Sequence, residues 1–173
     1  VDRNGDGAID DNDRYFYKNI DAPWTGGFYL KVAYKNWDLG TNFRASLGNY
    51  VYNDLIESRM NTDVRYNASK NFYENTTPDV AELRWKSYDY PLSDYFVQNA
   101  SYLKCDNITL GYNFEELLKL SNYQGLSGRI YASCSNVFTV TKYSGLDPEQ
   151  TSGFEGSVYP RCRTFLLGLN LNF

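Results

Sequence analysis

The sequence predicts an all-β protein, in which five consecutive antiparallel strands form the C-terminal part of a large transmembrane β-barrel. Three observations support this fold class. Apolar and polar residues alternate with period two in five segments, the connections between segments are alternately short and long, and aromatic residues make up 17% of the 173 residues. Alternation gives each strand one face for lipid and one for the lumen, and Tyr and Trp gather at membrane interfaces. No run of residues approaches the roughly 18 apolar positions of a membrane helix.

The last segment, residues 162–173, shows the alternation most clearly. Its apolar stripe is Phe165, Leu167, Leu169, Leu171 and Phe173, and its other face carries Thr164, Gly168, Asn170 and Asn172, with Leu166 as the one apolar exception. A transmembrane β-strand needs about 9–11 residues. A terminal Phe that completes such a stripe is recognised by the outer-membrane barrel assembly machinery in many barrels. We therefore interpret the five stripe residues as an assembly signal; the alternative is a half-buried strand of a soluble sandwich.

Two segments near the start are joined by a predicted turn at Lys35-Asn36. The first runs from 27 to 35 and the second from 37 to 50. The second places apolar residues opposite polar ones over a dozen positions: Trp37, Leu39, Thr41, Phe43, Ala45 and Leu47 face one way, and Asp38, Gly40, Asn42, Arg44, Ser46 and Gly48 face the other. This is the pattern of lipid outside and lumen inside.

Residues 97–114 form the third predicted strand, and their phase slips near Cys105-Asp106, which predicts a β-bulge. Residues 127–138 form the fourth. The polar stretch 51–94 is predicted to be a loop without a core, because it is too polar and too long for an ordinary hairpin connection. With the C-terminus on the periplasmic side, the long connections 51–94 and 139–160 fall outside, and the short turns fall inside.

The chain therefore divides into residues 1–26, an outer loop with a calcium-type motif, and residues 27–173, the C-terminal strands and loops. A five-stranded piece is odd-numbered and open, so alone it leaves an unpaired backbone edge, which lipid does not tolerate. We therefore expect the rest of the barrel upstream of Val1.

Composition argues against several functions. The chain has 17 basic and 21 acidic residues, which does not favour nucleic acid as a partner. It has no His, which removes His-based catalytic bases and the commonest transition-metal ligand. The adjacent pair Glu115-Glu116 does not converge as catalytic carboxylates would, so no enzymatic activity is predicted.

Cys105, Cys134 and Cys162 are an odd set without metal-ligand spacing. We interpret them as small apolar residues on strands. A hairpin centred near Leu120 would place Cys105 about opposite Cys134, and a disulfide there is the less favoured alternative because its geometry is tightly constrained.

Residues 2–13 match the twelve-residue calcium loop at nearly every position. Oxygen ligands would come from the side chains of Asp2, Asn4, Asp6, Asp10 and Asp13 and from the carbonyl of Ala8, with Gly7 at the sharp turn. Asp13 stands where an EF-hand has a bidentate Glu, which implies weaker coordination, and the flanks are not helical. The sequence therefore predicts a weak structural Ca²⁺ site; the alternative is an Asx-rich turn that binds nothing.

Several longer motifs resemble the C-terminal end of SusC/RagA-type TonB-linked outer-membrane transporters, over essentially the whole chain. The most specific are Tyr143-Ser144-Gly145-Leu146-Asp147-Pro148-Glu149 and the terminal strand. The others are Pro23-Trp24-Thr25-Gly26-Gly27-Phe28, Tyr34-Lys35-Asn36-Trp37-Asp38-Leu39, the Gly48–Asn53 stretch, the Ser101–Tyr112 stretch, and Tyr159-Pro160 followed by Arg163-Thr164-Phe165. Cys162 departs from the family, which often has Pro there.

The resemblance implies a barrel of about 22 strands closed by a plug, in the outer membrane of a Gram-negative bacterium. It also implies a SusD-type surface lipoprotein partner, contact with outer-membrane lipid, and TonB-energised import of oligosaccharides or peptides. The plug and the TonB-contacting segment would lie outside this chain.

Two readings from other classes remain as alternatives. One is a secreted, calcium-stabilised β-sandwich that binds glycans, which would need a second sheet to cover the apolar stripes. The other is a fragment of a cell-surface glycosidase, which would need two separated carboxylates in a cleft.

Overall fold

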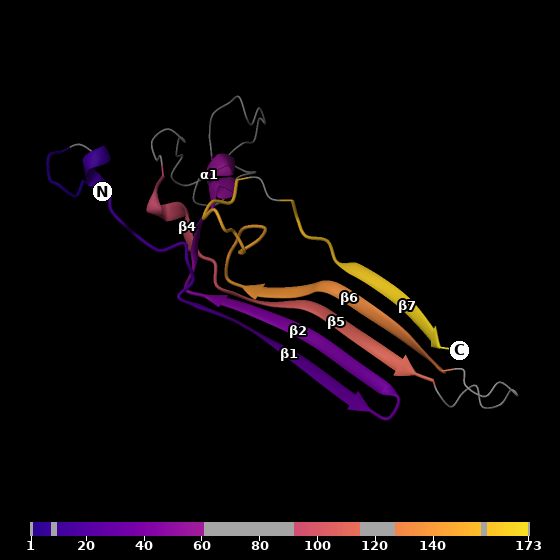
Figure 1. Cartoon of the computed structure of the whole chain (residues 1–173). Coiled ribbons are helices and arrows are strands. Elements are labelled where there is room, and N and C mark those ends of the chain that lie inside the picture. The colour runs from indigo at the N-terminus through magenta and orange to yellow at the C-terminus, as the bar shows by residue number, and fades with distance from the viewer. Residues whose placement is uncertain (1, 8–9, 61–91, 115–126, 157–158, 173) are drawn as a thin grey trace, which may run out of the picture.

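The computed structural model describes residues 2–7, 10–60, 92–114, 127–156 and 159–172. Five strands form one antiparallel sheet in the order β1-β2-β5-β6-β7 (Figure 1). Their bounds are β1 (Trp24–Tyr34), β2 (Trp37–Leu47), β5 (Tyr102–Asn113), β6 (Ser127–Thr141) and β7 (Thr164–Asn172). The predicted fold of five consecutive antiparallel strands is confirmed. Among the described residues, no helix is long and apolar enough to cross a membrane.

The strand bounds differ from the predicted ones at several ends. β1 begins three residues earlier than predicted, and β6 extends to Thr141. β2 ends at Leu47 because Gly48 turns the chain with φ +87°, and the ring of Pro23 lies so close that a Cβ on Gly48 would clash with it. The turn predicted at Lys35-Asn36 is present, with Lys35 at φ 52°.

The predicted strand 97–114 is in fact two strands in different sheets. β4 (Val97–Asn99) pairs with β3 (Tyr50–Tyr52) as a separate ribbon, whereas β5 belongs to the main sheet. The chain turns between them at Ala100, whose backbone N–H donates to the carbonyl of Asn49 at 2.9 Å. The hydrogen bond to Asn49 belongs to pairing with another connection, which the pattern of neighbouring residues does not report.

The register sorts the side chains of the main sheet into two faces, because directly paired residues point to the same side. Leu39 pairs with Leu110, Leu110 pairs with Ala132, and Ala132 pairs with Leu167. Rows of this kind make one side, the apolar face, and many of its large side chains are exposed: Phe28, Leu30, Val32, Trp37, Leu39, Leu110, Ile130, Phe165, Leu167, Leu169 and Leu171. The opposite side, the polar face, carries Asp38, Arg44, Lys104 and Arg129 among others. Within the described residues the only other sheet is the β3-β4 ribbon, which lies at one end of the strands (Figure 1).

The predicted bulge in β5 is confirmed. Cys105 pairs with Phe43 and Asn107 pairs with Asn42, so Asp106 is the extra residue. The insertion returns the next apolar side chain, Ile108, to the apolar face. Without it, every residue of β5 after the slip would point to the wrong side.

The predicted position of Cys105 opposite Cys134 is wrong. Cys105 pairs with Phe138, and Cys134 pairs with Ile108. The bulge, together with a hairpin that is not centred at Leu120, displaces the two cysteines along their strands. None of the three cysteines forms a disulfide: Cys105 is buried, Cys134 is half-buried and Cys162 is exposed.

The two long connections meet at one end of the sheet, and the β1-β2 turn lies at the other (Figure 1). At the first end, α1 (Asp54–Met60) follows β3, and the short helix η4 (Asp94–Phe96) precedes β4. The expectation of no core in this stretch is wrong. Tyr52 packs with Phe96, and Val51 packs with Ala100 and Tyr143, all of them buried.

Candidate functional site

Six charged side chains form a network on the polar face, where the sheet meets the 142–163 connection. They are Arg44 of β2, Lys104 and Asp106 of β5, and Asp147, Glu149 and Arg161 of the connection. We call this set the charge network. It contains three cations and three anions, so each charge finds an opposite partner close to the sheet.

Arg44 and the bulge form one half of the charge network. The Arg44 guanidinium donates from Nε and Nη2 to the two carboxylate oxygens of Asp106, and from Nη1 to Glu149 at 2.6 Å. Asp106 reaches Arg44 because it is the extra residue of the bulge. A bulge is a common way of redirecting a functional side chain in a sheet. The irregularity in β5 therefore restores the alternation and also supplies a charge partner.

Lys104 is the most deeply placed cation of the charge network, with only 2% of its surface exposed. Its Nζ lies 2.9 Å from Glu149 Oε2 and 3.7 Å from Asp147 Oδ1. Arg161 closes the other side, at 2.7 Å from Asp147 and 3.2 Å from Glu149. A buried ammonium requires such partners, because desolvation otherwise costs several kcal/mol.

Glu149 receives donors from both halves of the charge network. Burial acts to raise the pKa of Glu149, but the hydrogen bonds from Arg44 and Lys104 outweigh it and lower the pKa to about 2. Glu149 is therefore ionised throughout the neutral range, and the 142–163 connection stays tied to the sheet.

The 142–163 connection is also held from within by Glu155, which is 1% exposed. Its carboxylate accepts from the Tyr143 hydroxyl at 2.7 Å and from the backbone N–H groups of Leu146 and Asp147 at 2.8 and 2.7 Å. The family-specific stretch 143–149 thus wraps around one buried carboxylate. Burial, followed by the hydrogen bond to Glu155, raises the pKa of Tyr143, so its hydroxyl remains a donor.

The predicted calcium loop folds into a compact turn held by its own side chains. The Asp2 carboxylate accepts from the backbone N–H groups of Gly5 and Gly7, at 2.6 and 2.8 Å. The Asp13 carboxylate accepts from the N–H groups of Arg3, Asn4 and Asp10, at 2.6, 3.4 and 2.9 Å, and these bonds lower its pKa, with the bond from Arg3 the strongest cause.

Three other predicted ligands of the calcium loop, Asn4, Asp6 and Asp10, also form hydrogen bonds within the loop. The amide of Asn4 donates to Asp6 at 2.8 Å, and Asp10 caps the short helix η1 (Asp11–Asp13). Ala8 lies outside the described residues. Among the residues described, no three acidic, Cys or His side chains converge as a metal-binding group. Calcium binding remains a prediction.

The predicted assembly signal lies on β7 at the edge of the sheet. Its described members, Phe165, Leu167, Leu169 and Leu171, all point to the apolar face, and Phe165 and Leu167 are 78% and 80% exposed. Phe173 lies outside the described residues. The structure therefore shows the stripe but not its terminal ring, and the signalling role remains a prediction.

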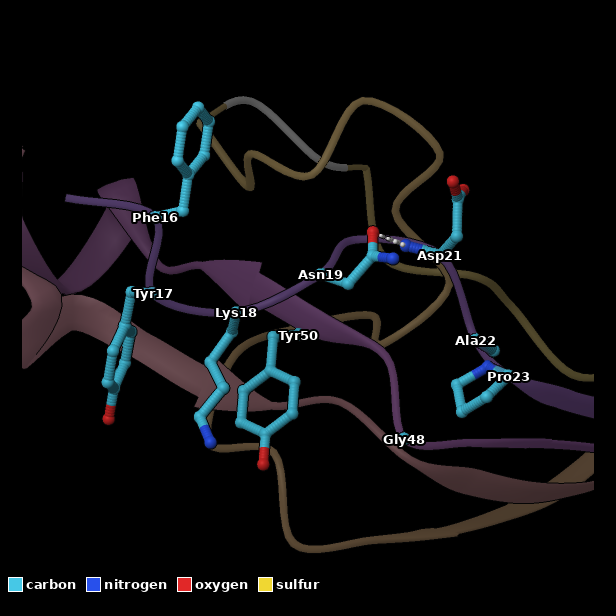
Figure 2. Close-up of a pocket in the computed structure, with 9 residues that line it drawn as sticks. All are labelled: Phe16, Tyr17, Lys18, Asn19, Asp21, Ala22, Pro23, Gly48 and Tyr50. Carbon is cyan, nitrogen blue, oxygen red and sulfur yellow. Dashed lines mark hydrogen bonds between the residues drawn. The ribbon is translucent and has the colours of Figure 1, made fainter.

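An open groove of about 580 Å³ lies between residues 16–23 and the corner from Gly48 to Tyr50, where the chain passes from β2 to β3 (Figure 2). The side chains of Tyr17, Lys18 and Tyr50 lie side by side, with the Lys18 ammonium 5.3 Å from one ring centre and 5.1 Å from the other. The backbone N–H of Tyr50 donates to the carbonyl of Asn19 at 3.1 Å, which fixes the crossing. The groove walls therefore combine aromatic faces with polar tips.

Sequence reasoning did not find the charge network, Glu155 or the groove. Directly bonded members of the charge network are up to 105 positions apart, as in the Arg44–Glu149 pair. One signal was available in part: Arg44 and Lys104 are charged residues within predicted strands, and a charge that loses water on folding needs an opposite partner. Of their partners, Asp106 lies at the bulge of β5, whereas Asp147 and Glu149 come from a loop, and no periodicity reports loop geometry.

Comparison with known proteins places this sheet in a family. The chain is 47% identical over 173 residues to the TonB-dependent receptor SusC of Bacteroides thetaiotaomicron. It is 31% identical, over an alignment of 194 residues, to the TonB-dependent receptor P3 of Formosa agariphila. All of this chain is covered in both alignments, but it spans only 17% and 18% of those relatives. No family model matches the chain.

Solved structures give the same assignment. The RagAB peptide transporter matches 90% of this chain and 18% of the solved chain, with a TM-score of 0.69 and 28% identity. The RagAB peptide importer in its open-open state matches with a TM-score of 0.68 and 26% identity. The sheet, with its uncovered apolar face, thus has the fold of the corresponding barrel segment of these TonB-dependent receptors and importers. Within that class, the chain belongs to the SusC/RagA type.

Proposed function

We propose that this chain is the C-terminal part of the barrel wall of an outer-membrane importer, which takes up oligosaccharides or peptides at the expense of TonB-transmitted energy. The observation that carries the proposal is the two-faced sheet, apolar and uncovered on one side and charged on the other. An uncovered apolar face matches lipid, and a face with Arg44, Lys104 and Arg129 matches a water-filled lumen. The relatives are named as receptors and importers, and we propose no enzymatic role.

The remaining parts of this function come from the relatives. SusC and P3 are named as TonB-dependent receptors, and RagAB is named as a peptide importer. We extend this to a Gram-negative outer-membrane location, a SusD-type surface lipoprotein partner, and insertion by the barrel assembly machinery. TonB would be contacted through a part of the protein outside this chain. The groove beside Tyr17 and Tyr50 supports a sugar or peptide substrate, because tyrosine rings give rigid amphipathic contact surface.

Whole-cell uptake tests the transport proposal. A strain that lacks the full-length gene should lose growth on one member of a panel of oligosaccharides and oligopeptides, and a plasmid copy should restore it. The restored growth should disappear when TonB is removed. Growth that is restored equally without TonB would contradict the proposal, as would loss of growth on no member of the panel.

Cysteine labelling of whole cells tests the orientation. Cys162 is exposed, so the background should carry Cys162→Ser. In that background, Ser152→Cys on the 142–163 connection should react with a membrane-impermeant maleimide, and Asn36→Cys at the β1-β2 turn should react only after lysis. The reverse pattern would show that the barrel segment is oriented the other way.

A further inference from the structure

We propose that Glu155 couples the two long connections structurally. Local opening of the 142–163 connection should then also open β3 and α1, which lie about a hundred residues away in sequence. The inference concerns how the parts at this end of the sheet are coupled, and it does not depend on the identity of the substrate.

The first link is the carboxylate of Glu155, which organises its own connection. It receives the Tyr143 hydroxyl and the two backbone N–H groups of Leu146 and Asp147, all within 2.8 Å. A carboxylate that is 1% exposed needs these donors, because burying an unsatisfied charge costs far more than a hydrogen bond returns. Removing the carboxylate therefore releases three donors at once.

The second link is the backbone of the same residue, which joins the other connection. The N–H of Glu155 donates to the carbonyl of Tyr52 at 3.0 Å, and the carbonyl of Glu155 accepts from the N–H of Leu55 at the start of α1, also at 3.0 Å. The N–H of Tyr52 donates to Gly153 at 2.8 Å, so residues 153–155 run parallel to β3. The ring of Phe154 packs on that of Tyr52, at 5.2 Å between ring centres.

The third link leads from Glu155 to the polar face of the sheet. The backbone N–H of Asp147 donates to the carboxylate of Glu155. The carboxylate of Asp147 in turn accepts a hydrogen bond from the backbone N–H of Glu149 at 3.0 Å. Asp147 and Glu149 are the two acidic members that the connection gives to the charge network. Glu155 is thus a positioning residue, which sets the backbone from which these two carboxylates reach Lys104.

Amide hydrogen exchange on the full-length receptor in detergent tests the coupling. Glu155→Ala should speed exchange about tenfold or more in residues 143–155 and also in residues 50–57, where a tenfold change corresponds to about 1.4 kcal/mol of local opening free energy. The β1-β2 hairpin should exchange as in the wild type, which verifies that the barrel is folded. Faster exchange in 143–155 alone, with 50–57 unchanged, would overturn the proposal.

Three further variants separate coupling from loss of folding. Glu155→Gln keeps an oxygen acceptor for the two backbone N–H groups, so both segments should show a smaller increase than in Glu155→Ala. Tyr143→Phe removes one donor and should raise exchange in the same two segments if Glu155→Ala fails to accumulate. Ser152→Ala is the control, because within the described part of the chain the exposed Ser152 side chain hydrogen-bonds to the backbone of Phe154, so the substitution should alter exchange locally. An equal effect of Ser152→Ala on residues 50–57 would also overturn the proposal.

Discussion

Arg129 of β6 binds Asp38 of β2 across the strand that separates them. Its Nη2 lies 2.6 Å from Oδ1 of Asp38 and its Nε lies 3.0 Å from Oδ2. The bridge passes over Gly111 of β5, where a Cβ would come within 2.5 Å of both partners. The absence of a side chain at this one position is therefore what lets the two charges meet.

Gly111→Ala should displace this ion pair and destabilise the full-length barrel. The expected cost is about 1–3 kcal/mol, the usual range for added volume in a packed site. The measurement is the temperature at which the folded protein loses its heat-modifiable mobility in a detergent gel. Gly26→Ala is the matched control, because nothing lies within 4 Å of a Cβ at Gly26 of β1. Equal shifts for the two variants would show that the strand backbone, and not the ion pair, is responsible.

The charge network should make stability depend on acid pH through Glu149. Its pKa falls from 4.5 to about 2 on folding, so the stabilising contribution is present above pH 4.5 and is lost as the pH falls towards 2. Glu149→Gln removes this contribution. The gap in melting temperature between wild type and Glu149→Gln should be constant from pH 7 to 5 and should shrink between pH 4.5 and 2. A gap that stays constant down to pH 2 would contradict the depressed pKa.

We propose that residues 2–13 bind Ca²⁺ at millimolar concentration, with Asp2, Asn4, Asp6, Asp10 and Asp13 as side-chain ligands and the Ala8 carbonyl as a backbone ligand. Calorimetry on chelator-treated full-length protein should show binding heat that Asp6→Ala and Asp10→Ala abolish.

A control for the calcium prediction is Asp11→Asn. Asp11 is exposed and pairs with Arg14, and it is not one of the proposed ligands, so this variant should bind like the wild type. If the wild type gives neither heat nor a melting shift at millimolar Ca²⁺, the loop is an Asx-rich turn held by its own hydrogen bonds.

Phe173→Ala should reduce the amount of protein in the outer membrane more than it reduces stability. Full burial of such a ring contributes roughly 1.5–3 kcal/mol, which a large barrel should survive. The larger effect is expected on insertion, because we interpret the terminal ring as the assembly signal. Quantitative blotting of outer-membrane fractions measures it, and Phe28→Ala is the control, because Phe28 is an exposed ring of the apolar face that lies on β1, outside the stripe. Normal accumulation of Phe173→Ala in the outer membrane would contradict the signalling role, and β7 would then be a barrel strand like the others.

The alternation of apolar and polar residues was enough to predict the five strands of the main sheet and, in the second and the last of them, the face that the side chains occupy. It also located the bulge, because one extra residue between Cys105 and Ile108 explains why the apolar positions shift by one place within the strand. These features are local: they depend on the period-two geometry of the strand and on residues adjacent in sequence.

The tertiary structure decided what depends on register and on the path of the loops. The partners of Cys105 and Cys134 follow from the exact centre of a hairpin, which alternation does not specify. The break at Ala100 follows from pairing with Asn49 in another connection. The charge network and the Glu155 contacts join residues tens of positions apart, and a loop has no repeating geometry from which such contacts could be read. Where the residues alternate, the sequence alone determined which side of the sheet a side chain faces, because side-chain direction is a local property of a strand. Which distant residues meet on that side was decided by the tertiary structure, because their contacts depend on the path of the whole chain.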